Sequence, residues 1–142
     1  MRRLRSCMKS QGRDSDTMAS AKGKGLMDVA LGLQYSGGQE DLYREFLAAF
    51  CDMQEAKRRQ VEDAFSAGHW KEYTDFVHSL KSTSLTVGGR QLSEAAKGLE
   101  MAGKEYLASG EEAQLRYLQD RHGEAMALWD AFTAEAREWL KK

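Results

Sequence analysis

The residues with the clearest chemical potential are His78 and Lys81, which lie three positions apart in a segment that predicts a helix. A neutral imidazole is a nucleophile near pH 7. A lysine one helical turn away can neutralise an anion that is attached to the imidazole. The pair therefore indicates chemistry with an anionic group, provided that His78 is accessible.

The position of His78 around its helix, predicted over residues 70–87, indicates that it faces solvent. At about 100° per residue, a predicted core stripe lies between about 140° and 240° from His78, almost directly opposite it. This stripe consists of Tyr73, Phe76, Leu80, Thr83, Ser84 and Val87. The predicted exposed face around His78 carries Lys71, Thr74, Asp75, Lys81, Ser82 and Leu85. A leucine beside an exposed histidine suggests that a partner docks there.

The other candidate ligands and nucleophiles predict no second site. His122 falls on the core line of the last predicted helix and is expected to be a satisfied interior group, and His69 is expected to begin a helix. Cys7, Cys51 and the histidines show no metal-ligand spacing, so we expect no metal. The chain has no P-loop and no glycine-rich loop before a helix, which disfavours phosphorylation from ATP.

The elements that must position His78 are helical. The 142 residues include no proline, 42% are apolar and 30% are charged, which suits one globular domain of long helices. Apolar periodicity predicts helices over about 27–33, 39–65, 70–87, 92–109 and 112–139. Short loops between long amphipathic helices make neighbours antiparallel. We expect an all-α fold, an antiparallel four-helix bundle with a short extra N-terminal helix.

The charge is divided unevenly along the chain. Residues 1–25 hold seven basic and two acidic residues and lack aromatic residues, so they predict a flexible basic extension to a domain over residues 26–142. A contact of this extension with nucleic acid or an acidic membrane is the alternative. The acidic remainder disfavours a nucleic-acid-binding bundle.

The compartment is also predicted from composition. No apolar run approaches the roughly 20 residues that span a bilayer, and no apolar segment follows the basic start as in a signal peptide. Two cysteines cannot form a disulfide framework. We expect a reduced, cytoplasmic protein without a membrane partner.

The segment HSLKSTSLTVGGRQL, residues 78–92, resembles the phosphorylation motif of histidine-containing phosphotransfer (HPt) domains. That pattern is roughly His-x-Leu-Lys-Gly-x-Ser, followed by Gly-Ala and then Leu. The similarity continues at Leu99-Glu100 and upstream in GGQEDLY, residues 37–43, and FLAAF, residues 46–50. It covers roughly residues 26–135.

The resemblance implies a phosphorelay intermediate that is a phosphocarrier and not an enzyme. Nε2 of His78 would accept a phosphoryl group from an aspartyl phosphate on a receiver domain and return it to a second receiver. The receiver would supply Mg²⁺, so this chain would need no cofactor. Lys81 would stabilise the phosphohistidine. Ser82 stands where the family commonly has glycine, so it either hinders docking slightly or hydrogen-bonds the phosphoryl oxygens; Thr74 is a weaker candidate for such a bond.

The resemblance also assigns partners and structural residues. Response-regulator receiver domains and a hybrid histidine kinase are the expected partners of a monomer, with Leu85, Lys71 and Thr74 as docking residues. Gly88 is expected to stop the helix, and Gly89, where the family has alanine, to loosen the turn. Two alternatives stay open: a bundle that binds receivers without being phosphorylated, and the terminal HPt domain of a hybrid or chemotaxis histidine kinase. The Met1 start disfavours the second of these.

Overall fold

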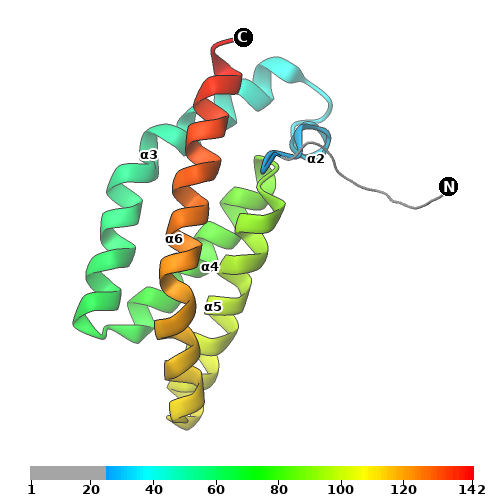
Figure 1. The fold of residues 1–142 in the computed structure, drawn as a ribbon. Helices are drawn as coiled ribbons and strands as arrows, with labels where there is room; N and C mark the ends of the chain where they lie inside the picture. The colour runs from blue at the N-terminus through cyan, green and yellow to red at the C-terminus, as the bar shows by residue number, and fades with distance from the viewer. Residues whose placement is uncertain (1–24) are drawn as a thin grey trace, which may run out of the picture.

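The computed structural model describes residues 25–142, and this part of the chain contains five α-helices and no strand. Their bounds are α2 (Val29–Tyr35), α3 (Glu40–Ala67), α4 (Trp70–Thr86), α5 (Arg90–Ser109) and α6 (Glu112–Leu140). The long helices α3 to α6 form the bundle, and α2 lies at one end of it (Figure 1). The predicted four-helix bundle with a short N-terminal helix is confirmed. The predicted basic extension lies outside the described residues, except for Gly25.

The helix ends follow from local sequence. Gly68 and Gly110 adopt left-handed backbone conformations, with φ of 72° and 70°, and each ends the helix before it. Glycine adopts this conformation without the steric cost of a Cβ atom. Glu40 and Asp41 occupy the first turn of α3, where carboxylates suit the helix dipole. The chain therefore reverses direction after α3 and again after α5.

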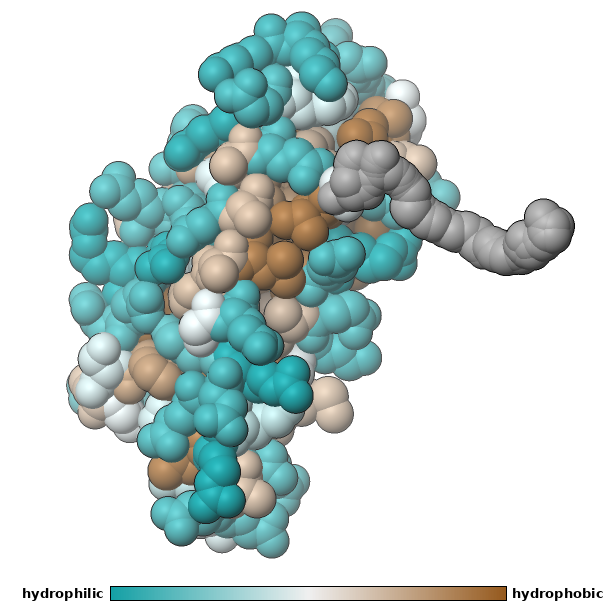
Figure 2. Space-filling model, viewed as in Figure 1, coloured by the Kyte–Doolittle hydropathy of each residue, from teal (hydrophilic) through white to brown (hydrophobic). Residues whose placement is uncertain are grey.

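The core lies between the four long helices. Its largest fully buried side chains include Tyr43, Leu47, Tyr73, Leu99 and Phe132, one or more from each long helix. The outer surface seen in Figure 2 is mostly hydrophilic, with hydrophobic residues gathered near the middle of the view. Burial of the apolar core side chains drives the four helices together.

In the described part of the chain no helix is long and apolar enough to cross a membrane.

The turn between α4 and α5 is fixed by the residues before α2. The backbone N–H of Asp28 donates to the carbonyl of Gly88 at 2.8 Å, and Gly88 has a φ of 85°. A Cβ atom on Gly88 would lie 2.3 Å from the Asp28 carbonyl oxygen. Gly88 is thus required by close approach as well as by its turn. A Cβ atom on Gly89 would lie 3.1 Å from the Phe132 ring, so Gly89 is closely packed here. That Gly89 loosens the turn stays a prediction.

Candidate functional site

His78 lies on α4 and its side chain is 57% exposed, as predicted. Its Nδ1 atom lies 2.5 Å from Oε2 of Glu100, on the neighbouring helix α5. The prediction that His78 points directly away from the core is therefore wrong, because one edge of the ring meets a buried carboxylate. His78 stands at the boundary between the α4–α5 contact and solvent.

The core face of α4 is turned towards α5 compared with the predicted stripe. Its buried residues are Tyr73, Thr74, Val77, Leu80 and Ser84, whereas Phe76 is half-buried and Thr83 is exposed. The reason is the close packing of α4 on α5, where Gly103 leaves room for the Thr74 side chain: a Cβ on Gly103 would lie 2.2 Å from Thr74 Oγ1. The small residue on α5 thereby sets the rotation of α4.

Glu100 is the buried centre of this site, with only 3% of its side chain exposed. Besides His78 it contacts two cations: Nζ of Lys81 lies 2.7 Å from Oε1, and Nζ of Lys104 lies 3.0 Å from Oε2. Burial by itself raises the pKa of the Glu100 carboxyl. The hydrogen bonds from Lys81, Lys104 and His78 outweigh burial and lower this pKa to about 2. Glu100 is therefore ionised near neutral pH.

The ionised carboxylate fixes the tautomer of His78. A carboxylate only accepts hydrogen bonds, so Nδ1 of His78 carries the hydrogen and donates it to Glu100. In the neutral ring, the unprotonated nitrogen with its lone pair is then Nε2, at the other side of the exposed imidazole. Nε2 is thus the ring nitrogen whose lone pair is available for nucleophilic attack.

The similarity to HPt domains extends to Glu100, but the sequence predicted no role for this residue. The sequence did not indicate Lys104 as a site residue. A signal for Glu100 was present, because it shares a helix face with Ala96 and Gly103, which are both buried. A carboxylate on the buried face of a helix needs hydrogen-bond donors or cations from a neighbouring helix. Those partners are far away in sequence, so the pattern within α5 does not identify them.

Of the two predicted phosphate-stabilising residues, Ser82 is exposed as predicted, whereas Lys81 is half-buried. Lys81 is half-buried, and its backbone carbonyl accepts a 2.8 Å hydrogen bond from Ser93 Oγ on α5. Ser82 is exposed one turn after His78, and its carbonyl accepts a hydrogen bond from Thr86 Oγ1. Lys81 thus lies on the carboxylate side of His78, and Ser82 on its solvent side.

The structure corrects the predicted docking residues in part. Thr74 is only 4% exposed and donates its hydroxyl hydrogen to the Trp70 carbonyl at 2.7 Å, so its prediction as an exposed docking or phosphate-binding residue is wrong. Lys71 is exposed and pairs with Asp75 at 2.8 Å. Leu85 is half-buried, so less of it is exposed than the helical periodicity indicated.

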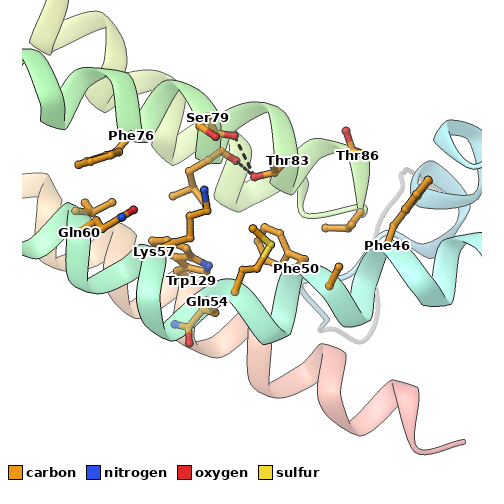
Figure 3. Close-up of a pocket in the computed structure, with 15 residues that line it drawn as sticks. Phe46, Phe50, Gln54, Lys57, Gln60, Phe76, Ser79, Thr83, Thr86 and Trp129 are labelled. Atoms are coloured by element: carbon orange, nitrogen blue, oxygen red, sulfur yellow. Dashed lines mark hydrogen bonds between the residues drawn. The ribbon is translucent and has the colours of Figure 1, made fainter.

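A hydrophobic groove lies on the other flank of α4, between α3 and α4, and has a volume of about 320 Å³. Figure 3 shows Phe46, Phe50 and Lys57 of α3 on one side of this α3–α4 groove, and Phe76, Ser79 and Thr83 of α4 on the other. Two lining residues, Phe46 and Met53, are 38% and 51% exposed. Ser79, which follows His78 directly in the sequence, lines the groove, whereas His78 itself does not. Sequence reasoning missed it, since it arises from the spacing between two helices.

The other histidines are structural, as predicted. His122 is 5% exposed, stacks on Phe65 with ring centroids 3.9 Å apart, and contacts the Tyr73 hydroxyl through Nδ1 at 2.9 Å. Its Nε2 contacts the Glu62 carboxylate. His69 precedes α4 as its N-cap residue and is exposed. Within residues 25–142, no group of three or more His, Cys, Asp or Glu side chains is placed to hold a metal ion.

Comparison with known proteins gives one result. The family model described as Hpt domain matches residues 45–139, more than half of the chain. No curated protein and no solved structure gives a significant match. The matched range contains His78, Lys81, Glu100 and Lys104, whereas the upstream similarity at residues 37–43 lies outside it.

Proposed function

Since the chain belongs to the Hpt domain family, whose members are phosphocarrier modules of two-component systems, we propose that His78 is its phosphoacceptor. In this proposal the protein is a phosphorelay intermediate between two receiver domains and not a catalyst. The observation that carries it is the contact of His78 Nδ1 with the buried Glu100 carboxylate, because this contact leaves Nε2 as the exposed nucleophile.

The proposed step is a direct displacement at phosphorus. Nε2 gives its lone pair to the phosphorus atom of an aspartyl phosphate, the P–O bond breaks, and the aspartate carboxylate leaves with the bonding electrons. The hydrogen on Nδ1 stays in place, and the ring becomes positively charged. Glu100 stabilises this charge, since its ionised carboxylate already accepts the Nδ1 hydrogen bond. Transfer to the second receiver reverses the step.

Lys81 supports the phosphorylated state in this proposal. It lies three residues after His78 and contacts the same carboxylate at 2.7 Å, so its positive charge is held near the imidazole. Phosphoryl transfer depends mainly on positioning and on stabilisation of charge. The rigid helix α4 supplies the position, and Lys81 supplies charge. Mg²⁺ belongs to the receiver domain in this proposal.

We place the receiver over His78 and the α3–α4 groove. The exposed surfaces of Phe46 and Met53 lie along this groove, and their burial against a partner is favourable. Ser82, one turn from His78, lies where the receiver approaches. The proposed partners are response-regulator receivers and a hybrid histidine kinase, in the cytoplasm, and the proposed state of this chain is a monomer.

The test is incubation of the protein with phosphorylated receiver domains from the same genome and, separately, with phosphoramidate. We expect the attached phosphate to be stable in base and labile in acid, because the P–N bond of phosphohistidine has these properties. His78→Gln should fold normally, because the side chain is more than half exposed and glutamine keeps a donor for Glu100. It should take up no phosphate. Receiver binding without phosphate uptake by the unaltered protein would instead support the phosphorylation-independent bundle.

A further inference from the structure

Lys104, on α5, shares an atom of Glu100 with the proposed phosphoacceptor. Its Nζ atom lies 3.0 Å from Oε2 of Glu100, and this is the oxygen that accepts the hydrogen bond from His78 Nδ1. Lys81 contacts the other carboxylate oxygen, Oε1. The ammonium of Lys104 and the imidazole of His78 therefore share one carboxylate oxygen, although the lysine comes from a different helix.

The contact of Lys104 with Glu100 contributes little to folding by itself. The Lys104 side chain is 67% exposed, whereas that of Lys81 is 30% exposed. An ion pair with a largely exposed lysine is weakened by water and by the entropy of a long side chain. Glu100 also has Lys81 and His78 as partners. Lys104 can therefore leave the carboxylate at low cost, whereas Lys81 is held more firmly.

The charges of the site change when His78 is phosphorylated. Before transfer, neutral His78, Glu100, Lys81 and Lys104 together have one positive charge in excess. A dianionic phosphoryl group on a positively charged ring adds one net negative charge. With Lys104 present the phosphorylated site is neutral, and without it one negative charge beside the buried Glu100 carboxylate has no counterpart.

We propose that Lys104 is a second phosphoryl-binding cation of this site, which moves from Glu100 to the phosphoryl oxygens as the P–Nε2 bond forms. This proposal rests on the proposed function of His78. Lys104 makes no bond to phosphorus and exchanges no proton; it trades one anionic partner for another. When Lys104 moves away, Oε2 of Glu100 accepts only the hydrogen bond from His78 Nδ1. This bond strengthens as the ring becomes charged.

The test compares Lys104→Ala with Lys97→Ala and Lys104→Arg. Lys97 is exposed two turns earlier on the same face of α5 and has no acidic partner in the part of the chain that the structure describes. Each protein is phosphorylated with phosphoramidate, and the labelling rate and phosphohistidine lifetime are followed by ³¹P NMR at low and high salt. We expect Lys104→Ala to lower both about threefold to tenfold at low salt, with a smaller difference at high salt. Lys97→Ala should match the unaltered protein, and Lys104→Arg should restore most of the loss.

The outcomes separate this proposal from the one on which it rests. If Lys104→Ala matches Lys97→Ala in rate and lifetime at low salt, the role of Lys104 is refuted while His78 remains the acceptor. If Lys104→Ala melts several degrees lower and Lys104→Arg does not restore the lifetime, the lysine is only structural and the proposal fails. If the unaltered protein takes up no label, or His78→Gln keeps it, both proposals fail.

Discussion

Glu100 and His78 are joined by a 2.5 Å contact between α5 and α4, although 22 residues separate them along the chain. Glu100→Gln should therefore weaken the nucleophile, because a neutral amide fixes the imidazole tautomer less firmly and does not stabilise a charged ring. We expect phosphorylation by phosphoramidate to slow about tenfold or more, with the fold retained. Labelling at the unaltered rate would show that Glu100 does not act on His78.

Glu100 should also make the free energy of unfolding depend on pH in the acidic range. Its carboxyl has a pKa of about 2 in the folded protein against 4.5 without the fold, because hydrogen bonds from Lys81, Lys104 and His78 outweigh burial. The resulting stabilisation, on the order of 3 kcal/mol, is complete above about pH 4.5 and is lost as the pH falls through about 2.

Urea unfolding at a series of pH values checks this dependence. The difference in the free energy of unfolding between the unaltered protein and Glu100→Gln should be largest near neutral pH and should shrink between about pH 4.5 and 2. Glu94→Gln is the matched control, since Glu94 is exposed on the same helix and has no basic partner in the described residues. A difference for Glu100→Gln that stays constant with pH would contradict the prediction.

Lys81→Ala should slow phosphate uptake and shorten the phosphohistidine lifetime without abolishing either. Lys81 is half-buried on Glu100, so its charge is screened less than that of a fully exposed lysine. Rates measured at several salt concentrations should show the largest defect at low salt. If the uptake rate and lifetime of Lys81→Ala match those of the unaltered protein at low salt, Lys81 has no electrostatic role in the reaction.

Two substitutions locate the receiver. Met53→Arg alters an exposed residue of the α3–α4 groove, and Leu85→Arg alters a half-buried leucine that does not line this groove. Burial of one apolar side chain against a partner contributes about 1.5–3 kcal/mol, so the variant on the true interface should bind receivers about tenfold to hundredfold more weakly.

We expect the larger loss for Met53→Arg and a smaller one for Leu85→Arg. Both should melt near the unaltered temperature, since neither residue belongs to the buried core, and both should react normally with phosphoramidate. Isothermal titration with a receiver domain measures the affinities. A larger loss for Leu85→Arg would show that the receiver binds at Leu85, the docking residue that the sequence indicated.

His122→Gln should affect stability and not transfer. His122 is buried between Glu62, Tyr73 and Phe65, and its replacement leaves polar partners without full hydrogen bonds. The loss should be about 1–3 kcal/mol in urea unfolding. Phosphorylation of His78 in the folded variant should proceed at the normal rate. A transfer defect without loss of stability would assign His122 to the functional site.

The sequence by itself determined the helices, the exposure of His78 and the interior place of His122. These properties follow from the spacing of residues within one helix, because each residue turns the chain by about 100° and a face is thereby defined locally. The proximity of Lys81 to His78 is local in the same sense. The motif around His78 also indicated the family correctly.

Only the tertiary structure decided which residues of different helices meet. The rotation of α4 on α5 buries Thr74 against Gly103 and brings His78 onto Glu100, and neither contact is encoded in the periodicity of α4. Lys104 joins the site because it lies one turn after Glu100, and the partners of Glu100 were identified only by the tertiary structure. The α3–α4 groove depends likewise on the distance between two helices, which is set by the packing of side chains from all four.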